Sequence, residues 1–158
     1  MILVVLGTQD KKFIRLLKIV ENAKKKGIIN DEVIVQAGKT KYKSDILDVH
    51  SFFTSKDFDK YMKQCDLLIT HGGVGNIVNG LLNKKKILVM PRLKLYKEHK
   101  NDHQEQITDK FVKLGYVRRI DSFDDLVSEY TNIDKFRPKF PKFDNSKMID
   151  ILSEFIER

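Results

Sequence analysis

The residues best suited to chemistry form a glycine-rich segment, His71-Gly72-Gly73-Val74-Gly75-Asn76, directly after an apolar run at residues 66–70. Glycines let the backbone approach a ligand closely, and a helix beginning here presents unpaired N–H groups and the positive end of its dipole to phosphate oxygens. The segment therefore predicts a diphosphate site that needs no metal ion. A tight strand-to-helix turn without any ligand explains the same glycines, and the segment by itself does not choose between the two.

A second polar segment, residues 91–104, lies directly before another expected helix and contains two of the four histidines. His99 and His103 are four residues apart, a spacing that suits metal ligands on a helix. Because this segment is expected to be a loop and has no cysteine beside it, no metal site is predicted. We expect Asp102 to cap the following helix, with His103 and Gln104 directed at a ligand crevice.

The elements that position these segments alternate along the chain. Short runs rich in Val, Ile and Leu alternate with segments of helical periodicity, which predicts an α/β fold: a Rossmann-like, mostly parallel sheet with helices on both faces. Gly115 is expected to end one helix, and Ser122 with Asp125 to begin another as a capping box. Strands are expected at residues 2–6, 32–36, 47–53, 66–70, 87–90 and 117–120. Helices are expected from 13 to the glycine at 27, around 58–62, at 76–82, between the loop that ends at 102 and the glycine at 115, after 122, and at about 144–157.

Four of the expected strand ends are polar or rich in glycine. In open parallel sheets, ligands bind outside the carboxyl ends of the strands, so these four ends are expected to converge on one crevice. The dinucleotide fingerprint G-x-G-x-x-G is absent after the first strand, and so is the Walker pattern, which disfavours NAD-binding and ATPase functions. The four ends are Gly7-Thr8-Gln9, Gln36-Ala37-Gly38, residues 71–76, and Pro91-Arg92.

Composition bounds the class of protein. The 158 residues are 41% hydrophobic and 33% charged, which fits a single globular domain over residues 1–158. Cys65 is the only cysteine, so no intrachain disulfide can form and a cytoplasmic location is expected. No apolar run approaches the roughly 20 residues that cross a bilayer, and the N-terminus lacks the pattern of a signal peptide, so neither spanning nor export is expected.

The net charge of +8 favours polyanionic partners, whether nucleic acid, acidic lipid headgroups or a diphosphate ligand. Two lysine triplets, residues 24–26 and 84–86, are expected at helix ends, where cations complement the helix dipole. The lysines are dispersed, and no RNA-recognition, helix-turn-helix or zinc signature is present. A nucleic-acid partner is therefore not expected.

Two of these segments together resemble a known family. They are residues 69–78, Ile-Thr-His-Gly-Gly-Val-Gly-Asn-Ile-Val, and the later pair Val89-Met90-Pro91-Arg92 and Asn101-Asp102-His103-Gln104. The chain resembles the small catalytic subunits of two-component glycosyltransferases in bacterial exopolysaccharide and capsule synthesis. These subunits are similar to the donor-binding lobe of the family 28 peptidoglycan N-acetylglucosaminyltransferase and to the soluble subunit of the eukaryotic dolichol-linked UDP-GlcNAc transferase. The likeness covers essentially the whole chain.

The resemblance implies a GT-B architecture in which this chain is a single donor lobe that binds a UDP-sugar. The reaction it implies is a metal-independent inversion without a cofactor, in which N–H donors and a nearby cation stabilise the departing diphosphate. By this likeness Gly72, Gly73, Gly75 and Asn76 cradle the diphosphate, Gln104 and His103 bond the sugar hydroxyls, and Gly7, Thr8 and Gln36 line the crevice.

Three further residues have open roles. Arg92 is the candidate cation for the leaving group. His71 is a local candidate for the general base, although the family takes its base from the acceptor lobe, and a buried histidine bonded to the backbone is an equal alternative. Asn79 stands where related lobes often carry a glutamate that grips the ribose, and an amide lacks the charge-assisted strength of a carboxylate.

The resemblance also implies partners. A membrane-anchored acceptor-lobe subunit would recruit the chain to the inner face of the membrane and present a polyprenyl-diphosphate-linked acceptor, to which galactose or N-acetylglucosamine is transferred. The alternative is a non-catalytic, nucleotide-sugar-binding regulatory subunit, which the asparagine at position 79 motivates.

Overall fold

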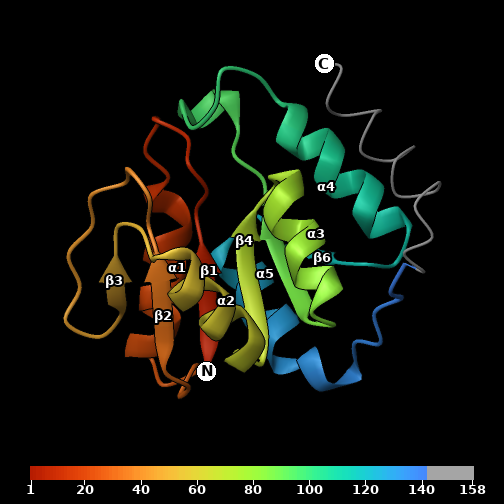
Figure 1. The fold of residues 1–158 in the computed structure, drawn as a ribbon, viewed down its shortest axis with the longest axis horizontal. Helices are drawn as coiled ribbons and strands as arrows, with labels where there is room; N and C mark the ends of the chain where they lie inside the picture. The colour runs from red at the N-terminus through yellow and green to blue at the C-terminus, as the bar shows by residue number, and fades with distance from the viewer. Residues whose placement is uncertain (142–158) are drawn as a thin grey trace.

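The computed structural model of the protein describes residues 1–141 as one sheet flanked by helices (Figure 1). The predicted C-terminal helix at 144–157 lies outside these residues. The strands are β1 (Ile2–Val5), β2 (Val33–Gln36), β3 (Asp48–His50), β4 (Leu67–His71), β5 (Lys86–Met90) and β6 (Arg118–Arg119). The helices are α1 (Ile14–Lys25), α2 (Ser55–Gln64), α3 (Val74–Leu82), α4 (His103–Lys113) and α5 (Phe123–Thr131), with short 3-10 helices η1 (Lys94–Tyr96) and η2 (Ile133–Lys135).

Within residues 1–141, the six strands are all parallel and lie in the order β3-β2-β1-β4-β5-β6. The chain moves outward in one direction from β1 to β3 and then returns to β4 on the other side of β1. Helices leave opposite faces at this switch point, so the carboxyl ends of β1 and β4 bound the crevice where such sheets bind ligands. The predicted Rossmann-like parallel sheet is confirmed.

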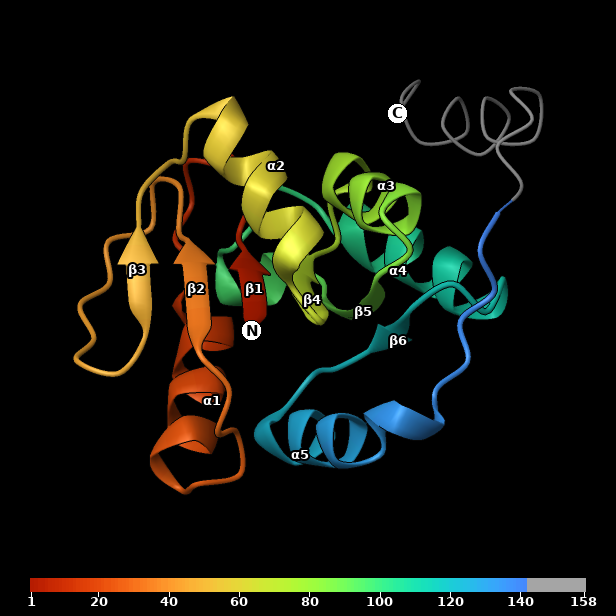
Figure 2. The same ribbon diagram turned by 60° about the horizontal axis from the view of Figure 1, so that its bottom comes forward.

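Two apolar layers enclose the sheet, one on each face. Figure 2 shows α1 and α5 on one side of the strands and α2, α3 and α4 on the other. Alternate residues of β1 belong to opposite apolar layers. Ile2 and Val4 pack with α1 and α5, whereas Leu3 and Val5 pack with the other three helices. A strand covered on both faces needs apolar residues at every position, which explains the unbroken run in the sequence.

Several element boundaries differ from the sequence-based prediction. Helix α3 begins at Val74 rather than at residue 76, whereas α4 begins at His103, directly after the predicted cap residue Asp102. The first turn of α3 contains glycine, so apolar periodicity does not reveal it. The strands β3 and β6 are shorter than expected. In the described part of the chain, no helix has the length and apolar character that crossing a bilayer requires.

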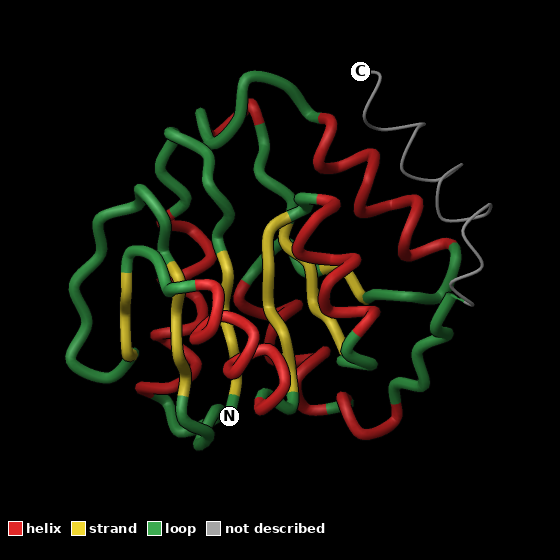
Figure 3. Tube along the Cα trace, in the orientation of Figure 1, coloured by secondary structure: helices red, strands yellow, loops and turns green. Residues whose placement is uncertain are grey.

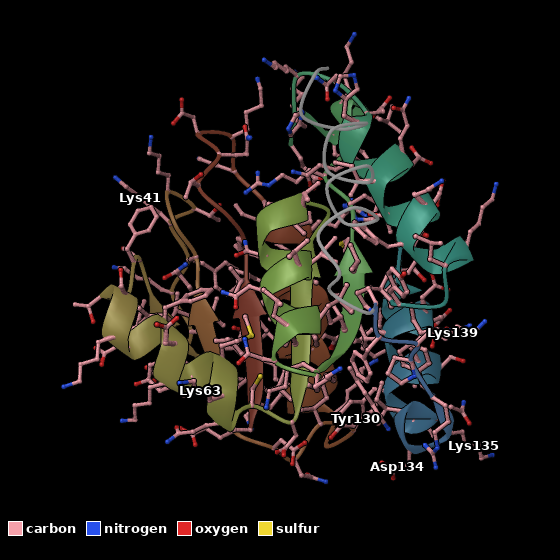
Figure 4. The ribbon with its side chains drawn as sticks, turned by 45° about the vertical axis from the view of Figure 1, so that its right-hand side comes forward. Lys41, Lys63, Tyr130, Asp134, Lys135 and Lys139 are labelled. Carbon is pink, nitrogen blue, oxygen red and sulfur yellow. The ribbon has the colours of Figure 1, made fainter. Side chains whose placement is uncertain are left out.

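The two lysine triplets have different surroundings. Lys24 and Lys25 occupy the last turn of α1, as predicted. The second triplet directly follows the end of α3, as predicted, although none of its lysines lies in the last turn of that helix. Lys85 donates from Nζ to the carbonyl oxygens of Lys63 and Cys65, both at 2.7 Å, so it complements the C-terminal end of α2, beside which Figure 4 labels Lys63.

The capping predictions near the end of the described chain are confirmed. Ser122 accepts from Asp125 N at 3.1 Å to begin α5, and the Asp125 carboxylate accepts in return from Asp121 N at 2.9 Å. Gly115 follows α4 with a φ of +79°, which glycine adopts without strain.

Helix α3 approaches the sheet closely through Gly80. A Cβ atom at this position would lie 2.7 Å from both Ile87 Cδ1 and Leu68 Cδ2. We expect Gly80→Val to lower the free energy of unfolding by about 1–3 kcal/mol in urea denaturation, because a larger side chain would push α3 away from the strands. Gly75→Ala, in the same helix but with open space around it, is the control and should not destabilise the chain. Equal effects of the two changes would contradict this packing.

Candidate functional site

The four strand ends singled out in the sequence meet at the carboxyl edge of the sheet. A Cβ atom on Gly7 would lie 2.4 Å from His71 Nε2, and one on Gly38 would lie 2.4 Å from the Gly7 carbonyl oxygen. Gln104, at the start of α4, accepts a hydrogen bond from Arg92 N at 3.1 Å. Figure 3 shows the loops at this edge beside the first turns of α3 and α4. The predicted convergence is confirmed.

The first turn of α3 leaves a row of backbone N–H groups without helical partners. Gly73 is the N-cap residue, and Ile77 N makes the first intrahelical bond, to the Gly73 carbonyl at 3.3 Å. The amides of residues 73–76 precede that bond, and within residues 1–141 no side chain caps them. Gly75 is exposed, with nothing within 4 Å of the place a Cβ would take. Unpaired amides at a helix N-terminus can bind an anion with the help of the helix dipole, and we call these four amides the anion seat.

Gly72 does not belong to the anion seat, which corrects the prediction. Its amide donates to Gln104 Oε1 at 3.0 Å, so the protein itself occupies this donor. A Cβ on Gly72 would lie 2.7 Å from the Gln104 carbonyl oxygen and 2.8 Å from Thr108 Oγ1. The glycine is therefore required here for the close packing of β4 against α4.

Gln104 is engaged at both ends of its side-chain amide. Oε1 accepts from the amides of Gly72 and Arg92, at 3.0 and 3.1 Å, and Nε2 lies 3.0 Å from His71 Nδ1. The side chain is enclosed, since the residue is only 4% exposed. This geometry opposes the prediction that Gln104 bonds sugar hydroxyls, because its hydrogen-bonding capacity is directed inward.

The hydrogen bonds of Gln104 also determine which ring nitrogen of His71 carries the proton. Two N–H donors require an oxygen as their acceptor, so the other end of the amide is the NH₂ group, which donates to His71 Nδ1. A neutral His71 then carries its proton on Nε2. That nitrogen lies 3.1 Å from the Asn76 side-chain amide, whose Oδ1 can accept the proton when the amide is turned by half a rotation.

Burial keeps His71 neutral. Loss of hydration, with the nearby positive charge of Arg92 as the next contribution, lowers the pKa of His71 to about 3. With Nδ1 accepting from Gln104 and Nε2 protonated, the neutral ring has no free lone pair for proton abstraction. The geometry therefore opposes the general-base role and makes His71 a hydrogen-bond donor beside the anion seat. Gly7 and Gly73 leave room for its ring, since a Cβ on Gly73 would lie 2.2 Å from His71 Cε1.

Arg92 lies inside the protein and not in the crevice. It has no exposed surface, and its guanidinium donates to the carbonyl oxygens of Leu6 and Lys11, both at 2.7 Å, and of Glu98 at 3.1 Å. Burial lowers its pKa to about 10, which still leaves it charged at neutral pH. Its place and bonds correct the prediction of a leaving-group cation: Arg92 ties the loop after β1 to the loop after β5.

The partly buried ion pair of Arg15 and Glu98 was not anticipated from the sequence. Arg15 Nη2 lies 3.0 Å from Glu98 Oε1 and also donates to the Pro91 carbonyl at 3.1 Å. Glu98 in turn accepts from Leu93 N at 3.1 Å. The residues are 83 positions apart, so no local spacing signals the pair.

The other predicted site residues lie around this centre. Thr8 is exposed directly after Gly7. Gln36 Oε1 accepts from Phe53 N at 2.8 Å, so Gln36 holds the segment that follows β3. Asn79, one turn beyond Gly75 on α3, accepts from Asn83 Nδ2 at 3.0 Å and is thereby partly engaged.

The start of α4 is capped by a different residue from the one predicted. Asp102 occupies the N-cap position, but its φ and ψ of −107° and 26° are not those of an extended cap, and its carboxylate accepts from Lys94 N at 2.9 Å. Asn101 Oδ1 accepts from His103 N at 3.1 Å in its place. His103 is partly exposed at the first position of the helix.

A pocket of about 240 Å³ opens near the same edge. Gln36, Phe52 and Phe58 contribute to its lining. Gly38 lies between this pocket and the anion seat. A Cβ on Gly38 would lie 3.7 Å from Phe52 Cζ and 2.4 Å from the carbonyl oxygen of Gly7, which itself packs against His71. A separate groove of about 790 Å³ lies at the opposite edge, where Figure 4 labels Tyr130 and Asp134 among its lining residues. None of the predicted site residues borders that groove.

The order of the parallel strands, with its switch point between β1 and β4, defines a Rossmann-like α/β domain. The sequence model of the glycosyltransferase family 28 C-terminal domain matches residues 1–156, and the chain belongs to that family. The glycosyltransferase class expected from the sequence is confirmed at the level of the family.

Curated relatives match parts of the chain. The UDP-N-acetylglucosamine transferase subunit ALG13 of Debaryomyces hansenii is 33% identical over 94 residues, which are 60% of this chain and 42% of that protein. ALG13 of Saccharomyces cerevisiae is 44% identical over 52 residues, 33% of this chain and 24% of that protein. The matched part thus spans less than half the length of these relatives.

Solved structures share the fold. The solution structure of ALG13 superposes with a TM-score of 0.63 at 22% identity, covering 99% of this chain and 96% of that one. MurG of Acinetobacter baumannii gives a TM-score of 0.57 at 14% identity, covering 83% of this chain and 40% of that one. The match to only part of MurG agrees with the expectation of a single GT-B donor lobe.

The control of Gln104 over His71 can be tested by Gln104→Glu. The second carboxylate oxygen replaces the Nε2 donor, so we expect the ring proton to move to Nδ1 and the pKa of His71 to rise by about 1 unit or more. Nitrogen-15 NMR of the histidine ring measures both changes. The control is Gln64→Glu, which adds the same charge at an exposed position on α2. An unchanged tautomer in Gln104→Glu would contradict the assignment.

The buried neutral state of His71 predicts a pH dependence of stability. The pKa falls from 6.5 in a free histidine to about 3 in the fold, so between these values the unfolded chain binds a proton that the folded chain does not. The free energy of unfolding should therefore fall as the pH falls from 6.5 towards 3, with up to about 1.4 kcal/mol per pH unit from this residue, and this residue should have no effect above that range. His71→Asn should show a shallower decline in urea denaturation, and equal slopes would refute the argument.

Proposed function

We propose that this chain is the donor-binding, catalytic subunit of a split, inverting glycosyltransferase that uses a UDP-sugar. The observation that carries the proposal is the anion seat of residues 73–76, with the Nε2–H group of His71 beside it, at the switch point of the sheet. The family to which the chain belongs and the printed names of its yeast relatives support a sugar-nucleotide ligand.

The diphosphate would be held by neutral donors. The amides at the start of α3 point along the helix axis, and the His71 Nε2–H group, whose direction Gln104 fixes, holds the side chain of Asn76 at the seat. Charge that develops on the departing diphosphate meets donors that need no rearrangement, which lowers the barrier without a metal ion. In this proposal Gly73, Gly75 and Asn76 keep the roles predicted from the sequence, and Gly7 is required for the histidine ring to fit.

The base and ribose of the donor would lie towards β2 and β3. The pocket at Gln36, Phe52 and Phe58 is lined by aromatic rings, against which a pyrimidine can stack. Phe52 is an exposed aromatic residue, as expected of a side chain that receives a ligand. Asn79 lies one turn along α3 from the seat, where its side chain is a candidate for the ribose hydroxyls.

The acceptor site and the general base would come from a second polypeptide. The chain corresponds to one lobe of the two that a GT-B enzyme needs, and its yeast relatives are named as subunits of a UDP-N-acetylglucosamine transferase. We therefore propose a membrane-anchored acceptor-lobe partner that recruits this chain to the cytoplasmic side of the membrane. The acceptor would be a polyprenyl-diphosphate-linked glycan in polysaccharide synthesis. N-acetylglucosamine is favoured over galactose as the transferred sugar by the relatives' names.

A non-catalytic, regulatory subunit is the second candidate. The engagement of Asn79 with Asn83, where a free carboxylate would grip the ribose more strongly, is the observation that favours it. Such a subunit would bind UDP-sugars but support no sugar transfer when combined with its partner, so a transfer assay on the co-purified complex separates the two functions.

The seat itself can be tested by Gly75→Asp. Because there is open space at this position, the change places a carboxylate on the diphosphate site without a clash. We expect the affinity for UDP in calorimetric titration to fall at least about 10-fold through like-charge repulsion, and sugar transfer by the complex to be lost. An acidic residue in the first turn stabilises a helix by about 0.3–1 kcal/mol, so the melting temperature should not fall, and lost binding cannot be attributed to unfolding.

Gly75→Ala is the matched control, since it adds a side chain without charge at the same position. It should retain most of the affinity. Absence of UDP binding in the unaltered chain, with and without the partner, would overturn the proposed function, as would unchanged binding in Gly75→Asp.

A further inference from the structure

The loop after β5 exposes two large apolar side chains at its tip. In η1, Leu95 is 79% exposed and Tyr96 is 54% exposed. These two side chains are adjacent, and they form an apolar surface that the described part of the protein does not cover. Isolated exposed apolar residues are common on proteins, so this pair by itself does not indicate contact with another molecule.

Positive charge surrounds this apolar pair. The Arg92 guanidinium donates to the Lys11 carbonyl at 2.7 Å, which brings the loop after β1 against the loop after β5, and Figure 1 shows both at the same end of the molecule. Both loops carry exposed lysines. We call the surface that they form with the two apolar residues the basic tip: Leu95 and Tyr96 with Lys11, Lys12, Lys94, Lys97 and Lys100.

The basic tip is held rigidly on α1. The Arg15 guanidinium lies 4.6 Å from the centre of the Tyr96 ring and pairs with Glu98, so one side chain fastens the turn at two points. Lys97 adopts a φ of +57°, which is unfavourable for a residue with a side chain, and yet a lysine occupies the position. The turn thus displays Leu95 outward in a fixed position.

An apolar groove of about 530 Å³ continues the surface along α1. Ile14, Ile19 and Tyr96 supply apolar surface, and Lys12 and Lys18 supply cations at the groove. Together, the groove and the basic tip combine apolar contact with positive charge, the combination that matches an anionic amphiphile.

We propose that the basic tip binds directly to an anionic lipid bilayer, with Leu95 and Tyr96 among the headgroups and the lysines at the lipid phosphates. Tyrosine favours the interface between bilayer and water, and lysine stems lie along apolar surface while their ammonium groups reach the phosphates. A protein partner fits less well, because lysine is depleted in protein interfaces. The inference stands on the loops after β1 and β5 and on α1, and it does not depend on the proposed function.

A tryptophan at the tip tests the contact, since the chain contains no tryptophan of its own. In the full-length protein, Leu95→Trp should show a blue-shifted emission with vesicles that contain phosphatidylglycerol, and quenching by brominated lipid. Vesicles of phosphatidylcholine alone should have little effect. The matched control is Leu82→Trp, because Leu82 is also exposed, at 53%, but lies at the far end of α3. No shift at position 95, or equal shifts at both positions, would overturn the proposal.

The charge requirement is tested by replacing Lys94, Lys97 and Lys100 together with glutamine. At about 5-fold in affinity for each lysine near an anionic surface, sedimentation with the same vesicles should weaken on the order of 100-fold. Replacing Lys56, Lys60 and Lys63 on α2 removes the same charge elsewhere and should have a much smaller effect. Equal loss in both sets would refute a specific surface. So would unaltered vesicle binding in the first set, or a Leu95-dependent self-association or protein complex without any vesicle binding.

Discussion

The side-chain amide of Gln104 is the interaction on which the site depends. It joins the first turn of α4 to the ends of β4 and β5 by accepting from two backbone amides, and its other end orients His71. The two ends of an amide are chemically different, so the backbone bonds determine which one faces the histidine. A structural bond between elements thereby sets the position of a proton at the edge of the proposed diphosphate site.

Space at this edge is as tightly constrained as hydrogen bonding. The His71 ring lies where a side chain on either Gly7 or Gly73 would collide with it, and Gly72 lies against α4. Three glycines in two separate segments are thus explained by packing around one histidine and one helix. Gly75, which has open space around it, differs from them, and there the absence of a side chain leaves the amide row accessible to a ligand.

The charged residues near the edge are divided between the interior and the surface. Arg92, with no exposed surface, binds backbone carbonyls, and Arg15 pairs with Glu98. Exposed lysines remain on the loops after β1, β2 and β5. The anion seat is therefore built of neutral N–H groups, while the positive charge that the composition predicts lies beside it, on a surface suited to a different anionic partner.

The sequence by itself determined the class of fold and the place of the site. Apolar runs in alternation with helical segments require a parallel sheet, and glycine-rich strand ends in such a sheet must meet at one edge, so Gly7, Gly73 and Gln104 could be predicted to converge. It did not give the first turn of α3, where glycine hides the helical period.

The tertiary structure alone decided the direction in which each polar side chain points. Gln104 and Arg92 were expected to face the ligand, but both are directed inward, because buried backbone groups at the strand ends require partners and these side chains supply them. Those partners are distant in sequence: the Arg92 bonds to Leu6 and Lys11 span 86 and 81 positions. Residue type and local spacing carry no information on such bonds, since they exist only once the sheet has brought the loops together.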